Sequence, residues 1–322
     1  MLLAAGTGTR LKPLTDYTPK PLAPIVNVPL LERTLRWLKE EGITEVVVNV
    51  HHHADQIQEA IGDGELLGIR VYYSVEKSLL GTSGAVRQCA ARFRDRPFYV
   101  IYGDNLVDAN LWRLNHFHKQ NQADATIGLF TPDDPSAVGM VDLADDGRVT
   151  QFIEKPSRGK VPPTATMANA GVYILNPSLL DTLPEGVSDF GHDMFPQWLK
   201  EGRRVFAVTL GGYLQDTGTP DRYRKANWDV VAGALSHHRP VGDWRPGGRG
   251  IIADGAIVDP GALLTYDTIV GPNCAVENNV ELNHCILWPG SIVRSGSVLD
   301  NVIVGTDTVV PTGTYARDTI LV

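Results

Sequence analysis

The C-terminal part of the chain carries an aliphatic residue at every sixth position, and this repeat constrains the fold more than any other feature. The ten aliphatic residues form two series of five separated by a step of four: Val258, Leu264, Val270, Val276 and Leu282, then Ile286, Ile292, Val298, Val304 and Val310. Gly, Pro, Asn and Asp fill many of the positions between them. A period of six predicts a parallel β-helix, in which short strands bury their side chains only when coils stack. A β-sandwich of short strands is the alternative, but it gives no reason for this spacing.

A change of composition near residue 236 separates this repeat from the rest of the chain. Residues 236–250, SHHRPVGDWRPGGRG, are rich in Pro, Gly and Arg and show no periodicity. Such a segment is typical of a linker. The predicted organisation is therefore a first domain over residues 1–235, a linker over 236–250 and a second domain over 251–322.

The chain before residue 236 alternates strand-like apolar runs with helical patterns. The β-branched run Ile43–Val50 follows a helical stretch at Pro29–Glu41, and further strands are predicted at Phe98–Tyr102, Ala125–Phe130 and Gly171–Leu175. This alternation predicts βαβ units and a mostly parallel sheet in an α/β fold. Ligands of such sheets bind at the carboxyl ends of the strands. Site residues are therefore expected in the loops that directly follow strands.

The composition excludes several classes of protein. The 322 residues include 29 Lys and Arg against 37 Asp and Glu, a net charge of −8, which disfavours a nucleic-acid partner. The hydrophobic content of 43% is enough for a sizeable core. No apolar run approaches the roughly 18 residues of a membrane span, and no signal peptide is expected. The three cysteines form no CxxC pair, so a reduced, cytoplasmic protein without disulfides or a zinc cluster is expected.

The segment with the strongest functional signal is LLAAGTGTRLKPLTDYTPKPLAP, residues 2–24. A short apolar strand leads into Gly6-Thr7-Gly8-Thr9-Arg10, where glycines and small hydroxyl residues let backbone N–H groups approach an anion. Arg10 and Lys20 add two positive charges suited to phosphate oxygens. The segment lacks both the GxxxxGK[ST] pattern of a Walker loop and the third glycine of the dinucleotide fingerprint. It indicates a phosphate-binding loop of a different type.

This segment resembles the signature of the sugar-1-phosphate nucleotidylyltransferases, or NDP-sugar pyrophosphorylases. Shorter matches follow in order at residues 80–85 (LGTSGA), 102–105 (YGDN), 138–139 (VG), 152–156 (FIEKP), 169–173 (NAGVY) and 216–220 (DTGTP). The hexapeptide repeat is similar to the left-handed β-helix of the GDP-mannose and ADP-glucose branches. The resemblance implies a Rossmann-like nucleotidyltransferase domain followed by a left-handed parallel β-helix of hexapeptide repeats.

The resemblance also implies a reaction and a set of site residues. An NTP and a sugar 1-phosphate would give an NDP-sugar and pyrophosphate, with Mg²⁺ and cationic side chains neutralising the phosphates and no covalent intermediate on the protein. Asp104 and Asp216 would bind Mg²⁺. The implied catalytic residues are Arg10, Lys20, Asp104 and Lys155. The implied nucleotide-binding residues are Ala4, Ala5, Gly6, Gly8, Thr9, Arg10, Lys20, Gly81 and Thr82, and the implied sugar-phosphate-binding residues are Gly139, Glu154, Lys155 and Asn169.

Several of these residues also have simpler interpretations. Asp104 and Asp216 could each cap a following helix, and Lys155 could be a solvated loop residue. Their joint order after strands favours the functional interpretation. The run His51–His53 precedes a helical pattern at Ala54–Ile61 and is predicted as a polar loop. A metal site is disfavoured there, because adjacent strand residues face opposite sides and the sequence nominates no further ligands for a tetrahedral site. The pairs His116/His118 and His237/His238 are expected at the surface.

The base and the sugar are the least determined part of the prediction. Residues 80–85 are most like GDP-mannose pyrophosphorylases, which favours GTP with mannose 1-phosphate or a related hexose or cyclitol phosphate. The opening Ala4-Ala5-Gly6 is equally common in uridylyl- and thymidylyltransferases, so UTP or dTTP with glucose 1-phosphate is the alternative.

Two other functions are weighed and disfavoured. A non-catalytic paralogue that only binds NDP-sugar should have lost one of the four charged residues Arg10, Lys20, Asp104 and Asp216, and all are present. A coenzyme-A-dependent acyltransferase would need a catalytic histidine in a longer repeat, and the repeat region offers only His284. The expected partners are the NTP, the sugar 1-phosphate and further copies of the chain through the β-helix, without nucleic acid or membrane.

Overall fold

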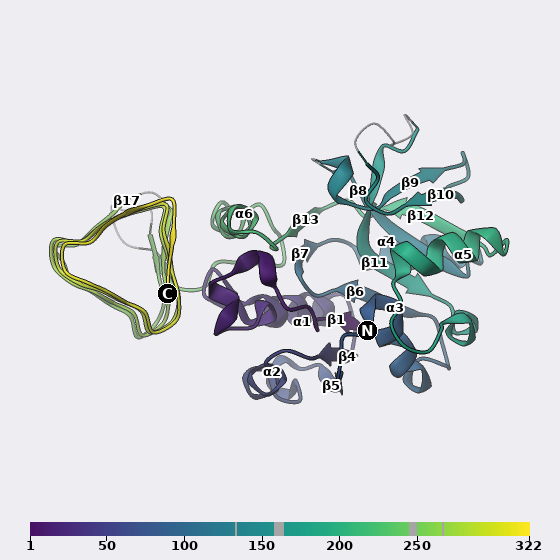
Figure 1. Cartoon of the computed structure of the whole chain (residues 1–322), viewed down its shortest axis with the longest axis horizontal. Helices are drawn as coiled ribbons and strands as arrows, with labels where there is room; N and C mark the ends of the chain where they lie inside the picture. The colour runs from purple at the N-terminus through teal and green to yellow at the C-terminus, as the bar shows by residue number, and fades with distance from the viewer. Residues whose placement is uncertain (133, 158–163, 245–249, 266) are drawn as a thin grey trace. The chain divides into compact units, whose positions relative to one another are not determined.

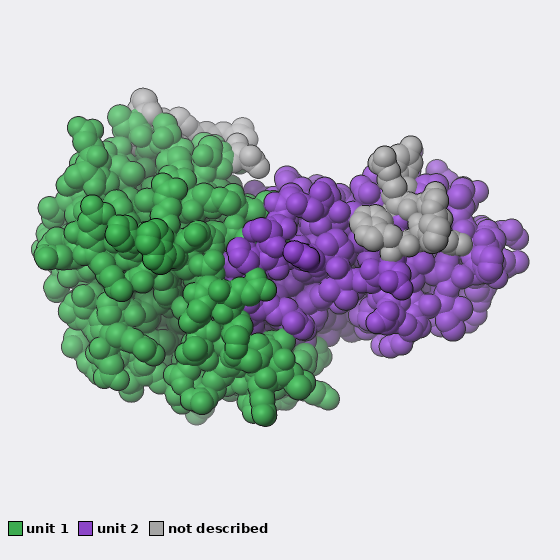
Figure 2. Space-filling model, turned by 180° about the vertical axis from the view of Figure 1, so that it is seen from behind, with its two compact units in different colours: residues 1–6, 38–214 green, residues 7–37, 215–322 purple. Residues whose placement is uncertain are grey.

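The computed structural model describes residues 1–132, 134–157, 164–244, 250–265 and 267–322. The chain divides into two compact units (Figure 2): residues 1–6 and 38–214 form unit 1, and residues 7–37 and 215–322 form unit 2. Among the described residues, none of the helices is both long enough and apolar enough to cross a membrane. Residues 245–249 of the predicted linker lie outside the described residues. The division at residues 235 and 251 stays a proposal.

Unit 1 is built on a nine-stranded sheet in the order β10-β9-β11-β6-β1-β4-β5, with β8 pairing with β11 and β12. The pairs β6–β1, β1–β4 and β4–β5 are parallel, so the predicted parallel sheet is confirmed. β11 runs antiparallel to β6, β8 and β9, and its continuous apolar run did not reveal this direction. The strands of the sheet are β1 Leu2–Leu3, β4 Glu45–Val50, β5 Arg70–Val75, β6 Phe98–Tyr102, β8 Ala125–Phe130, β9 Met140–Leu143, β10 Val149–Ile153, β11 Met167–Leu175 and β12 Val205–Thr209, and β7 Asn105–Asp108 lies outside this sheet.

Aromatic side chains form the centre of the core of unit 1. Tyr173 of β11 is fully buried, and its ring centroid lies 5.4 Å from that of Phe190 and 5.1 Å from that of Phe195. Burial of one such side chain contributes about 2 kcal/mol or more. The helices are α2 Ala54–Ile61, α3 Gly81–Gln88, α4 Leu111–Gln120 and α5 Phe195–Lys200, with short 3₁₀ segments at Glu65–Leu67, Ala90–Arg92, Pro135–Ala137 and Pro177–Thr182 and a π-turn at Phe190–Met194.

Two histidines predicted at the surface are buried. His118 on α4 is 3% exposed, and its Nδ1 lies 2.8 Å from Thr126 Oγ1 on β8, which gives the buried ring a polar partner. Burial lowers the pKa of His118 to about 4. His238 is 2% exposed. The hydroxyl partner of His118 lies on another element, so a local polar pattern could not distinguish it from a surface residue. The run His51–His53 forms the predicted loop before α2.

Unit 2 contains a parallel β-helix, whose triangular coils are seen end-on in Figure 1. Three stacks of parallel strands form its sides, β15-β18-β21-β24-β27, β16-β19-β22-β25 and β17-β20-β23-β26, and β14 adds an antiparallel edge to the first. The predicted β-helix is therefore confirmed. Its strands are β14 Asp243–Trp244, β15 Gly250–Ile252, β16 Ile257–Val258, β17 Leu263–Thr265, β18 Thr268–Val270, β19 Ala275–Val276, β20 Glu281–Asn283, β21 Ile286–Leu287, β22 Ile292–Val293, β23 Val298–Asp300, β24 Ile303–Val304, β25 Val309–Val310, β26 Tyr315–Arg317 and β27 Ile320–Leu321.

The register inside the β-helix differs from the predicted one in its middle coils. Ile251 pairs with Ile269, Ile269 with Ile286 and Ile286 with Ile303, so the first coil has 18 residues and the later ones 17. Each 17-residue coil contains one step of five, which moves the inward position by one residue. The side chains in the core are consequently Leu287, Val293 and Leu299 in place of the predicted Ile286, Ile292 and Val298. The prediction was wrong there because adjacent aliphatic residues occupy both faces of these strands.

Unit 2 also contains helices and short strands outside the β-helix. α6, Pro220–Val231, begins four residues after Asp216, and Thr219 caps it by accepting a hydrogen bond from Arg222 N at 3.4 Å. β13, Tyr213–Asp216, carries the chain into unit 2, and α1, Leu30–Glu40, carries it out of the first segment of that unit. The other elements are β2 Pro24–Ile25, β3 Val28–Pro29 and 3₁₀ turns at Thr9–Leu11, Leu14–Asp16 and Lys20–Leu22.

Candidate functional site

The carboxyl ends of the parallel strands of unit 1 lie at one edge of its sheet, as predicted. Leu3 pairs with Asn49 of β4 and with Tyr102 of β6, and Gly103 N donates to Leu3 O at 2.8 Å. Ala4 and Asp104 follow these strand ends directly. Asp104 leads into strand β7 rather than into a helix. The alternative interpretation of Asp104 as a helix cap is therefore wrong.

A buried polar network holds two of the predicted nucleotide-binding loops. Asn49 Oδ1 accepts from Ala4 N at 2.8 Å, and Asn49 Nδ2 donates to Glu76 Oε1 at 2.7 Å. Glu76 Oε2 accepts from Leu80 N at 3.0 Å, and both polar side chains are 3% exposed. The network ties the start of the Ala4 loop to the loop before Gly81. Sequence analysis missed Asn49 and Glu76, although a lone amide inside the run VVVNV was a usable signal.

Gly81 and Thr82 begin α3 against the segment that contains Asp189. Gly81 has φ +72°, and a Cβ atom there would collide with Ser188 O. Thr82 Oγ1 donates to Asp189 Oδ2 at 2.7 Å and accepts from Phe190 N at 2.9 Å. The structure therefore requires glycine at residue 81 for close backbone packing. The predicted role of Gly81 in nucleotide binding stays a prediction.

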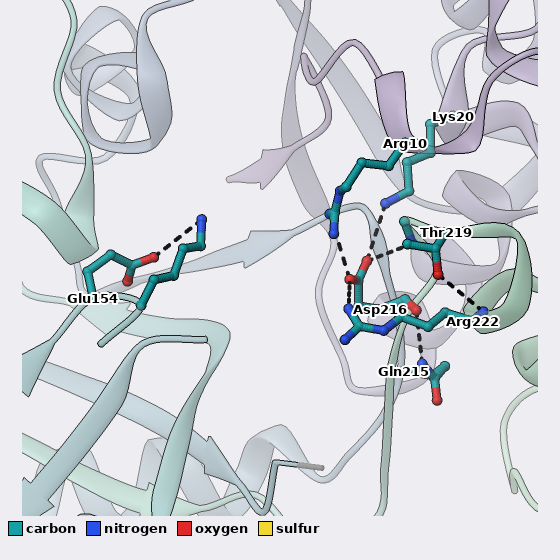
Figure 3. Close-up of polar contacts among 9 residues, drawn as sticks. Arg10, Lys20, Glu154, Gln215, Asp216, Thr219 and Arg222 are labelled. Atoms are coloured by element: carbon teal, nitrogen blue, oxygen red, sulfur yellow. Dashed lines mark hydrogen bonds and ion pairs between the residues drawn. The ribbon is translucent and has the colours of Figure 1, made fainter. Parts of the chain in front are cut away.

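The four predicted sugar-phosphate residues come together within unit 1. A Cβ atom at Gly139 would lie 2.7 Å from Glu154 Oε2, and Asn169 N donates to Gly139 O at 2.8 Å. Lys155 Nζ lies 3.6 Å from Glu154 Oε1 (Figure 3). Burial raises the pKa of Glu154, and the nearby Lys155 opposes this shift only in part. Asn169 is fixed by donating to Tyr173 Oη at 2.8 Å and accepting from Gly171 N at 2.9 Å.

Asp216 lies at the centre of a cationic cluster in unit 2 (Figure 3). Arg222 Nη1 donates to its Oδ2 at 2.6 Å, and Gly218 N donates to its Oδ1 at 2.7 Å. Lys20 Nζ lies 3.6 Å from Oδ1 and Arg10 Nη2 lies 3.7 Å from Oδ2. We call Arg10, Lys20, Asp216 and Arg222 the Asp216 cluster. Because Thr219 caps α6, the interpretation of Asp216 as a helix cap is wrong.

The electrostatics of the Asp216 cluster favour an ionised carboxylate. Burial would raise the pKa of Asp216, but Lys20, Arg10, Arg222 and the N–H of Gly218 together outweigh it and lower the pKa. Three cations and one anion leave a formal charge of +2. Such a cluster attracts polyanions such as phosphates. Sequence analysis missed Arg222, because its partner was not predictable from a position inside a helix.

The loop that carries Arg10 is held by close packing of Gly8. This glycine has φ +64°, and a Cβ atom there would lie 3.0 Å from both Lys20 Cβ and Thr15 Cγ2. Thr15 Oγ1 donates to Gly8 O at 2.9 Å. By contrast, a Cβ atom at Gly6 would meet no heavy atom within 4 Å in the described part of the chain. Gly8 therefore shapes the turn at Thr9–Leu11, while Gly6 leaves its backbone approachable.

The two predicted metal ligands fall in different units, Asp104 in unit 1 and Asp216 in unit 2. Within the described residues, no group of three or more His, Cys, Asp or Glu side chains could hold a metal ion. Mg²⁺ does not need such a group, since it binds one or two carboxylates together with phosphate oxygens and water. The joint binding of one ion by Asp104 and Asp216 stays a prediction.

The parallel sheet with loops at its strand ends and the phosphate-attracting cluster define an α/β enzyme for phosphorylated substrates. Residues 1–232 match the Nucleotidyl transferase family, and residues 247–321 match the family described as GMPPB C-terminal domain. A mannose-1-phosphate guanylyltransferase of Mycobacterium tuberculosis is 33% identical over 93% of this chain and 82% of its own length. A UTP–glucose-1-phosphate uridylyltransferase of Synechocystis is 30% identical over 94% of this chain and 82% of its own.

A solved structure shares this fold over part of the chain. HddC from Yersinia pseudotuberculosis has a TM-score of 0.60 and 26% identity over 71% of this chain and 97% of its own. The chain therefore belongs to the nucleotidyl transferase family. The predicted enzyme class, a sugar-1-phosphate nucleotidyltransferase, is confirmed.

Proposed function

We propose that this enzyme transfers the guanylyl group of GTP to mannose 1-phosphate, giving GDP-mannose and pyrophosphate. The observation that carries this proposal is the extent of the similarity: the mycobacterial mannose-1-phosphate guanylyltransferase matches through both the sheet-containing part and the β-helix. A uridylyltransferase matches over a similar extent. UTP with glucose 1-phosphate is therefore the second candidate.

In this proposal the two groups of site residues act on different substrates. Arg10 and Lys20 bind the NTP phosphates and stabilise the leaving pyrophosphate, which the +2 charge of the Asp216 cluster supports. Lys155 binds the sugar phosphate, supported by its exposed ammonium group beside Glu154. Glu154 and Asn169 bind sugar hydroxyls, and the backbone at Gly81 and Gly139 lies against base and sugar.

The proposal includes Mg²⁺ held by Asp216 and Asp104. The lowered pKa of Asp216 and its partial exposure of 26% suit a hard cation that arrives with phosphate oxygens. Bound there, the ion would neutralise charge on the phosphates. The chain's own cations then hold the polyphosphate, and no side chain needs to form a covalent bond with substrate.

Assembly and compartment belong to the proposal as well. Large apolar side chains of the β-helix are exposed, among them Ile257 at 74%, Leu263 at 53% and Tyr315 at 73%. These support a homo-oligomer formed through the β-helix, because exposed apolar surface is often buried between subunits. The cytoplasm stays the proposed compartment.

Release of pyrophosphate from a matrix of substrates tests the reaction. The purified chain is assayed with GTP, UTP, dTTP, ATP and CTP, each with mannose 1-phosphate and with glucose 1-phosphate, at millimolar Mg²⁺. We expect the highest kcat/KM with GTP and mannose 1-phosphate. Turnover restricted to UTP or dTTP with glucose 1-phosphate would replace this proposal with the second candidate.

A further inference from the structure

Three consecutive residues at the start of α6 connect the Asp216 cluster with the β-helix inside unit 2. Arg222 makes the shortest ion pair of the cluster, with 2.6 Å between its Nη1 and Oδ2 of Asp216. Arg10 and Lys20 stand further from the carboxylate, at 3.7 and 3.6 Å. Arg222 is thus the cation that hydrogen-bonds to Asp216, beside the backbone N–H of Gly218, and without Arg222 either Arg10 or Lys20 could take that place.

Tyr223 fixes the helix to the β-helix and to the segment after Lys20. It is fully buried, and its hydroxyl accepts from Trp288 Nε1 at 2.9 Å and donates to Pro24 O. The rings of Tyr223 and Trp288 lie 6.0 Å apart between centroids at an angle of 64°. A buried pair with matched donors and acceptors holds its geometry, since separating it leaves polar atoms unpaired.

Arg224 binds two different coils of the β-helix. Its Nη2 donates to Asn301 O at 3.1 Å and to Thr319 O at 3.4 Å, and its side chain is 9% exposed. Its Nη1 lies 3.2 Å from Asp221 Oδ1. The guanidinium therefore fastens the first turn of α6 to the last two coils, which fixes the helix against rotation about its own axis.

We propose that Arg222 is a positioning residue for nucleotide binding, and that the β-helix holds it in place through Tyr223 and Arg224. By taking the hydrogen bond to Asp216, Arg222 keeps the carboxylate from closing onto Arg10 and Lys20, whose charges then remain for phosphate oxygens. The inference rests on the proposed function of the cluster in binding NTP phosphates. It assigns the β-helix a role in the active site beyond assembly.

The first experiment replaces Arg222 and measures phosphate binding without turnover. Isothermal calorimetry with inorganic pyrophosphate, in buffer without divalent ions, is expected to give about a tenfold higher Kd for Arg222→Met than for the unchanged chain. Arg222→Lys should restore most of the affinity. In steady-state assays Arg222→Met should raise KM for the NTP by a similar factor and leave KM for the sugar phosphate within twofold.

The second experiment disturbs the anchor at a distance from the cluster. Tyr223→Phe and Trp288→Phe each remove the hydrogen bond between the two rings and change no charge, and we expect a threefold to fivefold rise in the pyrophosphate Kd. Tyr315→Phe and Trp112→Phe are matched controls, because both side chains are exposed, at 73% and 68%. Thermal melts check that every variant is folded.

Non-additivity decides whether the anchor acts through Arg222. The double variant Arg222→Met/Tyr223→Phe should bind pyrophosphate no more weakly than Arg222→Met alone. The inference would be overturned if the increases in Kd from the two substitutions multiplied in the double variant. It would also be overturned if Kd were unchanged in folded Tyr223→Phe and Trp288→Phe. If the unchanged chain turns over no NTP but binds pyrophosphate as described, the proposed function fails and the positioning role stands.

Discussion

At the scale of single residues, Asp216 and Glu154 show how environment separates two carboxyl groups. Asp216 has three cations around it and a lowered pKa, whereas Glu154 is packed against Gly139 and Gly191 and has a raised pKa. The first is held ionised and suits cations and charged donors. The second carries a cost of ionisation that a hydrogen-bonding ligand can reduce.

The two predicted metal ligands should respond differently to loss of charge. Asp104→Asn and Asp216→Asn are each expected to lower kcat by at least about 100-fold, because each removes a carboxylate proposed to hold the Mg²⁺ that would neutralise phosphate charge in the transition state. Only Asp216→Asn should also destabilise the fold, by about 3 kcal/mol, because it removes the anion beside the buried Lys20 and the partly exposed Arg222. Assays and urea denaturation measure the two effects, with Asp181→Asn at an exposed pair as control. Full activity of Asp104→Asn would remove it from the metal site.

Replacing Glu154 with Gln should stabilise the fold in a pH-dependent way. A carboxyl group whose pKa is raised by folding stabilises the native state below its unfolded pKa and loses that contribution as pH rises through the folded value. Glu154→Gln should therefore raise Tm at pH 7, by about 2 °C. The difference should disappear near pH 4, where the natural residue is protonated. Scanning calorimetry at both pH values checks this, and an equal gain at both would contradict the assigned cause.

At the scale of elements, the candidate site residues of unit 1 lie in or near loops that follow strands, and buried polar residues in and beside the strands hold these loops. The glycines, the cations Arg10, Lys20 and Lys155 and the strand-end residues of the candidate site could be selected from the sequence, because each carries a local signal such as GTGTR or DTGTP, while their roles stay predictions. Glu76 and Arg222 carried no such signal, because their roles depend on partners brought close by the fold, whereas Asn49 was visible as a lone amide in the run VVVNV. The β-helix was predictable from its period, but the register of its middle coils was not, because Ile286-Leu287 and Val298-Leu299 offer two adjacent aliphatics.

The network of Asn49 predicts a large cost for losing one amide. Asn49→Leu removes the acceptor of Ala4 N and the donor to Glu76, leaving the N–H of Ala4 after β1 and the carboxylate of Glu76 after β5 without these partners. We expect destabilisation of about 3 kcal/mol, since each unsatisfied buried group costs about 1–3 kcal/mol. Urea denaturation measures it, and the exposed Gln56→Leu on α2 is the control. A change below 0.5 kcal/mol would mean that the loop does not depend on this amide.

At the scale of the whole molecule, each of the two units is built from two separate segments of the chain. Residues 7–37, which include Arg10 and Lys20, belong to the same unit as α6 and the β-helix, whereas the sheet that carries Asp104, Glu154 and Lys155 forms the other. The polyphosphate side and the sugar side of the proposed site thus depend on different cores. A substitution that destabilises one core should therefore affect the other segments of the same unit, rather than neighbouring segments of the sequence that belong to the other unit.

A cavity in the β-helix tests this division. Leu282→Ala empties part of a fully buried position and should destabilise unit 2 by about 2–5 kcal/mol. Hydrogen–deuterium exchange should then rise in α6 and in residues 7–22 as well as in the coils, with β4 and β5 unchanged. Ile127→Ala, in the core of unit 1, is the matched control and should give the reverse pattern. If Leu282→Ala raised exchange in the coils alone, residues 7–22 would owe their order to unit 1, and the β-helix could not hold Arg222 in place.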